Sequence, residues 1–119
     1  MSERNIPNLM LILEMTEKIQ RHIQSIHSLA EFEKDEKTFD ACMMDFIVIG
    51  ELVVKLSHDF LEKHNHVEWY KIRAFRNFAA HDYFGINPKK VWEIIQNKIP
   101  ELKNNIQKII NGYNVGQQG

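Results

Sequence analysis

Apolar residues recur along this chain every three or four positions, which is the period that an amphipathic α-helix requires. Between residues 9 and 29 these positions are Leu9, Ile12, Leu13, Ile19, Ile23 and Ile26. Between residues 39 and 60 they are Phe39, Cys42, Met43, Phe46, Ile49, Val53, Leu56 and Phe60. The alternating pattern of a β-strand is nearly absent. The sequence therefore predicts an all-α protein.

Charged and polar stretches separate the periodic segments. The stretch 31–37 is expected to connect the first two helices. Thr38 is a candidate N-cap for the second helix, because its hydroxyl can accept a hydrogen bond from a free backbone N–H. The polar stretch 58–66 is expected to end that helix. Gly50 inside it costs about 1 kcal/mol relative to alanine, so we expect another helix to approach closely there.

The C-terminal half carries its own start and stop signals. A third helix is expected over about 68–83, with Gly85 as its stop signal. Asn87 and Pro88 are typical of the N-cap and first residue of a fourth helix. Pro100 predicts either a kink in that helix or the start of a new segment.

Length and composition fit one helical domain. The chain has 119 residues, of which 44% are hydrophobic and 26% charged, as in soluble globular proteins. We predict an antiparallel up-and-down bundle of four to five helices over residues 1–112. Residues 113–119 have nothing to pack against and are expected to form a disordered tail.

The same sequence indicates a cytoplasmic protein with no membrane segment. No apolar run approaches the roughly 20 residues needed to cross a bilayer, and the N-terminus lacks the pattern of a secretory signal. Cys42 is the only cysteine, so no internal disulfide and no cysteine metal cluster are possible.

The net charge of −1 is unevenly distributed. The window 71–90 contains five basic residues and one acidic residue, so it carries +4 and the rest of the chain carries −5. A local basic field can attract a polyanion such as RNA. Chance clustering on a solvated helix face explains the same distribution equally well.

The densest polar functionality lies in the segment 73–85, RAFRNFAAHDYFG. Successive helical residues turn by about 100°, so Arg73, Asn77 and His81 share a face, whereas Arg76 and His81 lie about 140° apart. Histidine can act as acid or base near neutral pH, and arginine binds phosphate bidentately. These residue types suit metal-independent cleavage of RNA, whose 2′-hydroxyl is an internal nucleophile. A histidine that only interacts with the helix dipole is the commoner explanation of such spacing.

The segment 76–83, RNFAAHDY, matches the R-x4-H-x-Y motif of HEPN-domain proteins, and the chain resembles the HepT-like family of toxin ribonucleases. The similarity extends beyond the motif. TFDACMMDFIVIGELVVKLS, with its Ile49-Gly50-Glu51, is similar to the second helix of that family. VEWYKIRAFRNFAAHDYFGIN and VWEIIQNKIPELKNNIQKI are similar to its third and C-terminal helices. These blocks cover most of the chain.

The resemblance implies a helical bundle that forms a homodimer and cleaves RNA as a metal-independent endonuclease without a cofactor. Arg76 and His81 would be the catalytic pair, supported by Asn77, and the dimer would bring two motifs into one cleft. The partner implied is an antitoxin with a nucleotidyltransferase fold, which silences the toxin by transferring AMP to Tyr83. The bulk and negative charge of that AMP would block a phosphate-binding site.

Further residues could support this site. Glu51 follows Gly50 and is expected to pair with an arginine such as Arg73 or Arg76, in a structural role more often than in orienting the site. Arg73 shares the helix face of Asn77 and is a second supporting candidate. The candidates for contacts with RNA are Lys71, Lys89 and Lys90.

Two other functions remain open. One is a non-catalytic helical module that docks a nucleotidyltransferase and presents nucleotide or Tyr83 to it. The other is a plain helical dimer whose motif is structural. A metal site is not predicted, because His58, His64 and His66 have no acidic or cysteine neighbour at a recognised ligand spacing.

Overall fold

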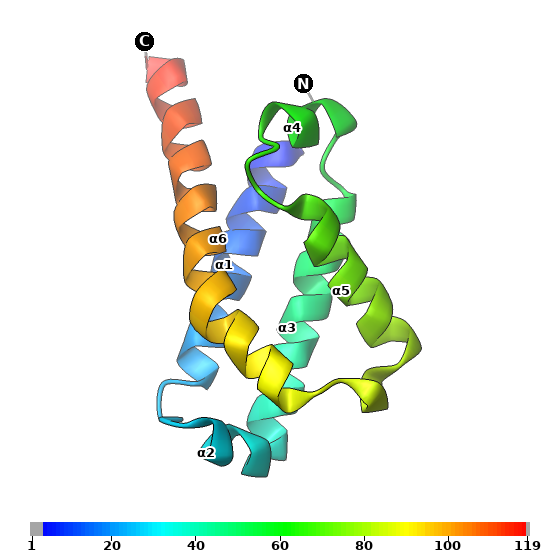
Figure 1. Ribbon diagram of the computed structural model, residues 1–119. Helices are drawn as coiled ribbons and strands as arrows, with labels where there is room; N and C mark the ends of the chain where they lie inside the picture. The colour runs from blue at the N-terminus through cyan, green and yellow to red at the C-terminus, as the bar shows by residue number, and fades with distance from the viewer. Residues whose placement is uncertain (1–3, 119) are drawn as a thin grey trace.

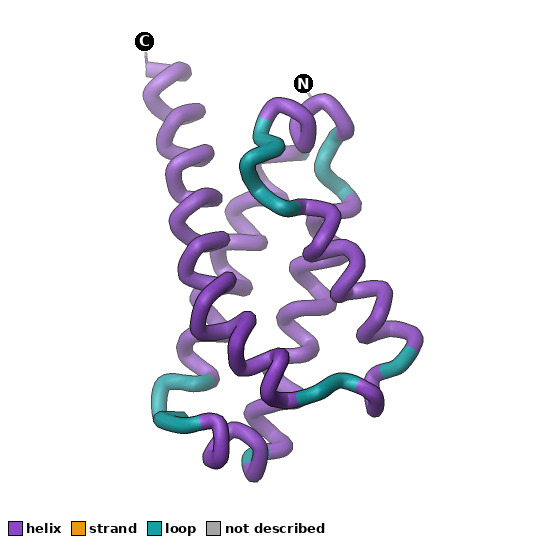
Figure 2. The backbone as a smooth tube through the Cα atoms, in the orientation of Figure 1, coloured by secondary structure: helices purple, strands orange, loops and turns teal. Residues whose placement is uncertain are grey.

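The computed structural model describes the backbone of residues 4–118 and the side chains of residues 4–114. This part of the chain is helical and contains no strand, which confirms the predicted all-α class (Figure 2). The helices are α1 (Asn5–His22), α2 (Leu29–Lys34), α3 (Glu36–Val54), α4 (His58–Lys63), α5 (Trp69–His81), η1 (Tyr83–Gly85) and α6 (Pro88–Gln118), of which η1 is a 3₁₀ helix.

The four long helices form an up-and-down bundle, with α1 and α5 running in the opposite direction to α3 and α6 (Figure 1). Helix α3 packs against α1 and against α5, and α1 also packs against α6. The short helices α2 and α4 lie at the two ends of the bundle. The expected four to five helices therefore correspond to the long helices, to which the described part of the chain adds the two short ones.

The core forms where the apolar faces of α1, α3 and α6 meet. Its fully buried aliphatic side chains include Leu9, Ile12, Ile19, Met43, Ile49, Val53, Val91, Ile95 and Ile106. Burying one such side chain is worth about 1.5–3 kcal/mol. The three- and four-residue spacing of the sequence thus gives the faces along which the helices pack.

The short helices α2 and α4 occupy stretches in which the sequence analysis expected only polar connections. A serine hydroxyl caps each of them. Ser28 Oγ accepts a hydrogen bond from the Glu31 N–H at 3.2 Å, and Ser57 Oγ accepts one from the Phe60 N–H at 3.3 Å. One ring in each helix, Phe32 or Phe60, is buried in the core. A cap and a buried ring stabilise helices that are too short to show an amphipathic period.

Several helix ends differ from the sequence prediction, and two of them lie at α1 and at the start of α3. Helix α1 ends at His22 instead of continuing to residue 29. Helix α3 begins at Glu36 and is capped by Asp35 instead of Thr38. Asp35 Oδ1 accepts the Thr38 N–H at 3.0 Å and Oδ2 accepts the Thr38 hydroxyl at 2.8 Å, which lowers the pKa of the Asp35 carboxyl. A charged carboxylate accepts hydrogen bonds more strongly than a hydroxyl does, so Asp35 is the better cap.

Helix α6 begins where the sequence predicted. Its first residue is Pro88, and Asn87 Oδ1 accepts a hydrogen bond from the Lys89 N–H at 2.9 Å. Pro100 lies inside the helix without ending it. The helix changes direction between its yellow and orange parts in Figure 1, as expected where a proline removes one backbone hydrogen bond.

Helix α6 continues to Gln118, whereas the sequence analysis expected ordered structure to end at residue 112. The ring of Tyr113 stacks on that of Phe60 with 6.2 Å between the ring centroids. This aromatic contact with α4 supplies packing that the sequence pattern did not reveal. No helix in the described part of the chain combines the length and the apolar character needed to cross a membrane.

Candidate active site

Helices α3 and α5 approach each other closely at Gly50. A Cβ atom added to Gly50 would lie 2.6 Å from Cγ of Arg76, closer still to Cβ, and 3.7 Å from Cα. Non-bonded carbon atoms lie at about 3.5–4.0 Å at their optimum, so any residue larger than glycine would force the two helices apart. The close approach expected from the position of Gly50 is confirmed, and it places the base of the Arg76 side chain against α3.

Glu51 and Asn77 hold the guanidinium of Arg76. Arg76 Nε donates a hydrogen bond to Glu51 Oε1 at 2.5 Å, and Nη2 forms an ion pair with the same oxygen. Arg76 Nη1 donates to Asn77 Oδ1 at 3.1 Å. The expected pairing of Glu51 with an arginine is confirmed, and Arg76 is the partner. A guanidinium has five N–H donors, so these contacts leave two of them for another acceptor.

His81 is the last residue of α5 and is exposed to solvent. It lies five positions after Arg76 on the helix, which corresponds to about 140° of rotation. Within the described residues, His81 forms no hydrogen bond or ion pair with Arg76 or Asn77. A single protomer therefore presents the arginine and the histidine on different sides of α5. Arg73, also exposed, lies one turn before Asn77 and does not share in the contact with Glu51.

Tyr83 lies beyond the end of α5, because the helix stops at His81 and the chain turns into η1. Asp82 stabilises the turn by accepting the Gly85 N–H at 3.1 Å. Arg76 and Tyr83 therefore do not share the helix face that a longer third helix would have given them. The hydroxyl of Tyr83 donates a hydrogen bond to Asp40 Oδ1 at 2.5 Å. Burial of the phenol, together with this bond to a carboxylate, raises the pKa of Tyr83.

Asp40 is a polar residue of the site that the sequence analysis did not identify. It lies on α3, 43 positions from Tyr83, and no local spacing relates the two. Asp40 and Glu51 are eleven residues apart on α3, so the anchors of Tyr83 and Arg76 lie roughly 16 Å apart along that helix. The Arg76 guanidinium and the Tyr83 hydroxyl are thus held at separate points along α3.

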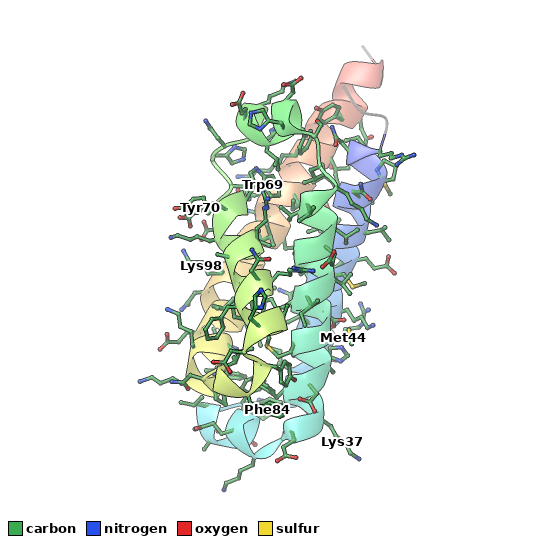
Figure 3. The ribbon with its side chains drawn as sticks, turned by 90° about the vertical axis from the view of Figure 1, so that its right-hand side faces the viewer. Lys37, Met44, Trp69, Tyr70, Phe84 and Lys98 are labelled. Carbon is green, nitrogen blue, oxygen red and sulfur yellow. The ribbon has the colours of Figure 1, made fainter. Side chains whose placement is uncertain are left out.

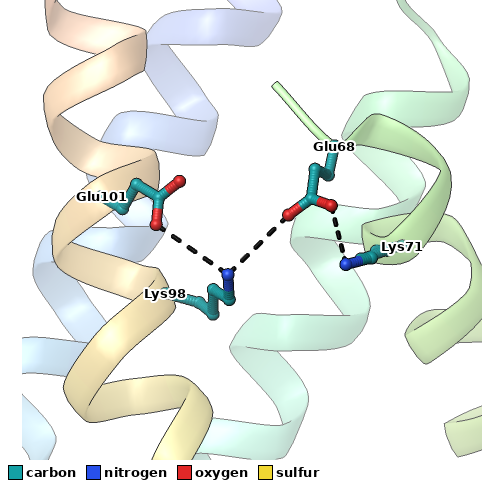
Figure 4. Close-up of polar contacts among 4 residues, drawn as sticks. All are labelled: Glu68, Lys71, Lys98 and Glu101. Atoms are coloured by element: carbon teal, nitrogen blue, oxygen red, sulfur yellow. Dashed lines mark ion pairs between the residues drawn. The ribbon is translucent and has the colours of Figure 1, made fainter. Parts of the chain in front are cut away.

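Two basic residues of the window 71–90, Lys71 and Arg76, are paired with carboxylates. Lys71 Nζ pairs with Glu68 at 2.7 Å. Glu68 also faces Lys98 of α6 at 3.8 Å, and Lys98 contacts Glu101 at 4.0 Å (Figure 4). This network joins the start of α5 to α6 and neutralises the charge of Lys71. Contacts of RNA with the exposed Lys89 and Lys90 stay a prediction.

Large apolar side chains are exposed on α3, α5 and η1. Met44, Tyr70 and Phe84, which are labelled in Figure 3, have exposed fractions of 61%, 68% and 98%. Phe78 of α5 is 49% exposed. Exposed apolar side chains close to a polar motif are typical of surfaces that contact another molecule.

Comparison with known protein families shows to which family this chain belongs. The model of the family described as "Ribonuclease HepT-like" matches residues 12–109. The chain belongs to the HepT-like family. The match begins in α1, ends in α6 and contains Gly50, Glu51 and the whole R-x4-H-x-Y segment. The resemblance inferred from the sequence is thereby confirmed.

Individual HepT-like relatives agree with this assignment. "Putative RNase TTE0752" from Caldanaerobacter subterraneus subsp. tengcongensis is 36% identical over 87% of this chain and 92% of its own length. "Putative RNase MJ0127" from Methanocaldococcus jannaschii is 41% identical over 67% of this chain and 66% of its own length. "Probable ribonuclease HepT" from Thermococcus cleftensis is 28% identical over 82% of this chain and 84% of its own length. None of the solved structures matches this chain.

Proposed function

We propose that this protein is a metal-independent endoribonuclease that acts as a homodimer and serves as the toxin of a toxin–antitoxin pair. The observation that carries the proposal is the held guanidinium of Arg76, which keeps two N–H donors available on the helix that also bears His81. Membership of the HepT-like family supports ribonuclease activity.

The proposed reaction needs only groups of the protein and the RNA. His81 accepts the proton of a ribose 2′-hydroxyl, whose oxygen attacks the adjacent phosphorus. The bond from phosphorus to the 5′-oxygen of the next nucleotide breaks, and that oxygen takes up a proton from the protonated His81. The products are a 2′,3′-cyclic phosphate and a free 5′-hydroxyl. Arg76 stabilises the extra negative charge of the pentavalent transition state.

The spacing of Arg76 and His81 on α5 supports the proposed homodimer. Arg76 and His81 lie about 140° apart around α5, so helix geometry alone does not bring the two side chains to one phosphate. A second protomer can place its His81 opposite the first protomer's Arg76. Met44, Tyr70 and Phe78 offer apolar surface for that contact on the two helices that carry the site.

Regulation is proposed to act through Tyr83. A nucleotidyltransferase antitoxin would attach AMP to its hydroxyl, only two residues after His81. The added negative charge would repel RNA phosphate from the end of α5. Tyr83→Phe should therefore still cleave RNA but escape modification, as intact-mass measurement after incubation with ATP and the antitoxin would show. Modification of the phenylalanine variant at another residue would refute this assignment.

RNA cleavage by purified, unmodified protein in the presence of a chelator tests the nuclease directly. Arg76→Ala and His81→Ala should each lower the cleavage rate by about 10²–10⁴-fold while the variants remain helical. Arg21→Ala and His58→Ala are matched controls, because they remove the same side chains from exposed positions on α1 and α4. Light scattering should give the mass of a dimer for every variant.

A second candidate function is a non-catalytic module that binds a nucleotidyltransferase. It is favoured by one observation, the neutralisation of Arg76 by Glu51 in the single protomer. In that case folded protein has no RNase activity, and Arg76→Ala weakens binding of nucleotide or of the partner instead. Absence of cleavage across several RNAs by an unmodified dimer would favour this candidate over the nuclease.

A further inference from the structure

The Tyr83–Asp40 contact joins a phenol to a carboxylate at the surface of the molecule. Tyr83 Oη and Asp40 Oδ1 are 2.5 Å apart, with the hydroxyl as donor. The ring of Tyr83 is held edge-on by Phe39 at 6.0 Å and by Phe84 at 5.9 Å between centroids. Since both the ring and the turn η1 are held in place, the hydroxyl points to one acceptor.

A hollow of about 660 Å³ opens beside this hydroxyl. Its charged lining consists of Asp40 and Glu36 of α3 and Glu33 of α2. From η1, α6 and the residues between them, the lining includes Phe84, Ile86 and Pro88, which do not titrate. A small electrophile can therefore reach Tyr83 from solvent, and no cationic side chain lines the hollow among the described residues.

Asp40 is free to accept a proton. Its side chain is exposed, and within the described part of the chain the bond with Tyr83 is its only side-chain hydrogen bond or ion pair. Burial and the carboxylate keep the Tyr83 phenol protonated at neutral pH by raising its pKa. Attack by the oxygen at neutral pH then requires that the proton be removed during the reaction.

We propose that Asp40 is the general base for transfer of a phosphorus-containing group to the Tyr83 hydroxyl. The Tyr83 Oη–P bond forms as the bond from phosphorus to its leaving group breaks, and the phenol proton passes to Asp40 Oδ1 and then to water. With a nucleoside triphosphate, attack at the α-phosphorus releases pyrophosphate and leaves a nucleoside monophosphate on Tyr83.

This role deepens the proposed regulation of Tyr83 and rests on it for its biological meaning, but its chemistry can be tested without the antitoxin. If the hydrogen bond between Tyr83 and Asp40 only stabilises the packing of η1 against α3, the reactivity of the Tyr83 hydroxyl should respond differently to substitution of Asp40. A purely structural Asp40 predicts that Asp40→Asn does not slow attack by the hydroxyl, because an amide oxygen accepts the same bond and loss of the carboxylate lowers the pKa of Tyr83.

The experiment measures phosphorylation of individual tyrosines by diisopropyl fluorophosphate, which transfers its phosphoryl group with loss of fluoride. Site-resolved mass spectrometry follows Tyr83, with exposed Tyr70 of α5 as internal reference. Asp40→Asn should slow labelling of Tyr83 at least about tenfold at pH 7, the lower range of general-base effects. Glu36→Gln removes an equal charge from the same hollow and should leave both rates within about twofold of the wild-type values.

The pH dependence gives a second, independent readout on the unaltered protein. Labelling of wild-type Tyr83 should stay nearly level between about pH 6 and 8, because attack assisted by a general base does not depend on free phenolate, whereas unassisted attack by phenolate rises about tenfold per pH unit. In Asp40→Asn the labelling rate of Tyr83 should rise about tenfold per pH unit. At alkaline pH it should exceed the wild-type rate, since loss of the carboxylate lowers the pKa of Tyr83.

Labelling of Tyr83 at pH 7 that is as fast in Asp40→Asn as in the wild type, or faster, or a tenfold rise per pH unit in the wild type, would overturn the role of Asp40. Neither result bears on RNA cleavage. Conversely, failure of an antitoxin to modify Tyr83 would refute the proposed regulation and leave the labelling result intact.

Discussion

Replacement of Gly50 by alanine has two opposite effects on the free energy of unfolding, one from the helix propensity of the residue and one from the packing of α3 against α5. In an isolated helix this change is favourable by about 1 kcal/mol. In the folded protein the new methyl group would lie 2.6 Å from Cγ of Arg76 and closer to its Cβ. The Cβ atom of Arg76 is fixed by the backbone of α5, so a change of rotamer cannot relieve the overlap. Helix α5 has to move away from α3.

The size of the effect follows from these two opposing contributions. Overpacking of a well-packed contact costs about 1–3 kcal/mol, which exceeds the gain in helix propensity. We expect Gly50→Ala to lower the free energy of unfolding by up to about 2 kcal/mol. The displacement of α5 should also weaken the hydrogen bonds from Arg76 to Glu51, and with them any RNA cleavage that depends on Arg76.

Gly112 of α6 is the matched control, because nothing lies within 4 Å of a Cβ atom added there. Gly112→Ala should raise the free energy of unfolding by up to about 1 kcal/mol. Urea denaturation followed by circular dichroism measures both variants on one scale. If Gly50→Ala is as stable as Gly112→Ala, the close approach of α5 to α3 at Gly50 is not a rigid feature of the fold and the argument fails.

Two further predictions concern titratable groups. Hydrogen bonds from Thr38 lower the pKa of Asp35, so its cap stabilises α3 above the unfolded-state pKa and is lost as pH falls through the folded-state value. In urea titrations Asp35→Ala should thus be less stable than the wild type at pH 7, and the difference should shrink in acid. A difference that does not change with pH would contradict this. Burial, together with the charges of Asp45 and Asp35, raises the pKa of Cys42 to about 12. The native thiol should accordingly resist iodoacetamide at pH 8 and react only when the protein unfolds in urea; rapid alkylation of the native protein would show that Cys42 is accessible.

Features that depend on residues close together in the sequence could be predicted from the sequence alone. The apolar period predicted the long helices, and Asn87 with Pro88 predicted the start of α6. The close approach at Gly50 was also predicted, since a glycine in a strongly apolar helix suggests that a side chain would not fit. These features share one physical cause, because backbone geometry and local hydrogen bonds act over a few residues.

The short helices α2 and α4 show where local patterns stop being informative. Each has six residues, fewer than two turns, so its single buried ring cannot produce a recognisable period. Their serine caps resemble ordinary polar connections. Only the packing of Phe32 and Phe60 into the core turns these stretches into helices.

The sequence by itself determined the helical class, the family and the residue types of the motif. The tertiary structure decided which groups meet. Glu51 pairs with Arg76 across 25 positions and Asp40 accepts the Tyr83 hydroxyl across 43 positions. Such contacts depend on how α5 and η1 lie against α3, which is set by the packing of the whole bundle. Periodicity specifies which face of a helix is buried, but it carries no information about which distant side chain that face will meet.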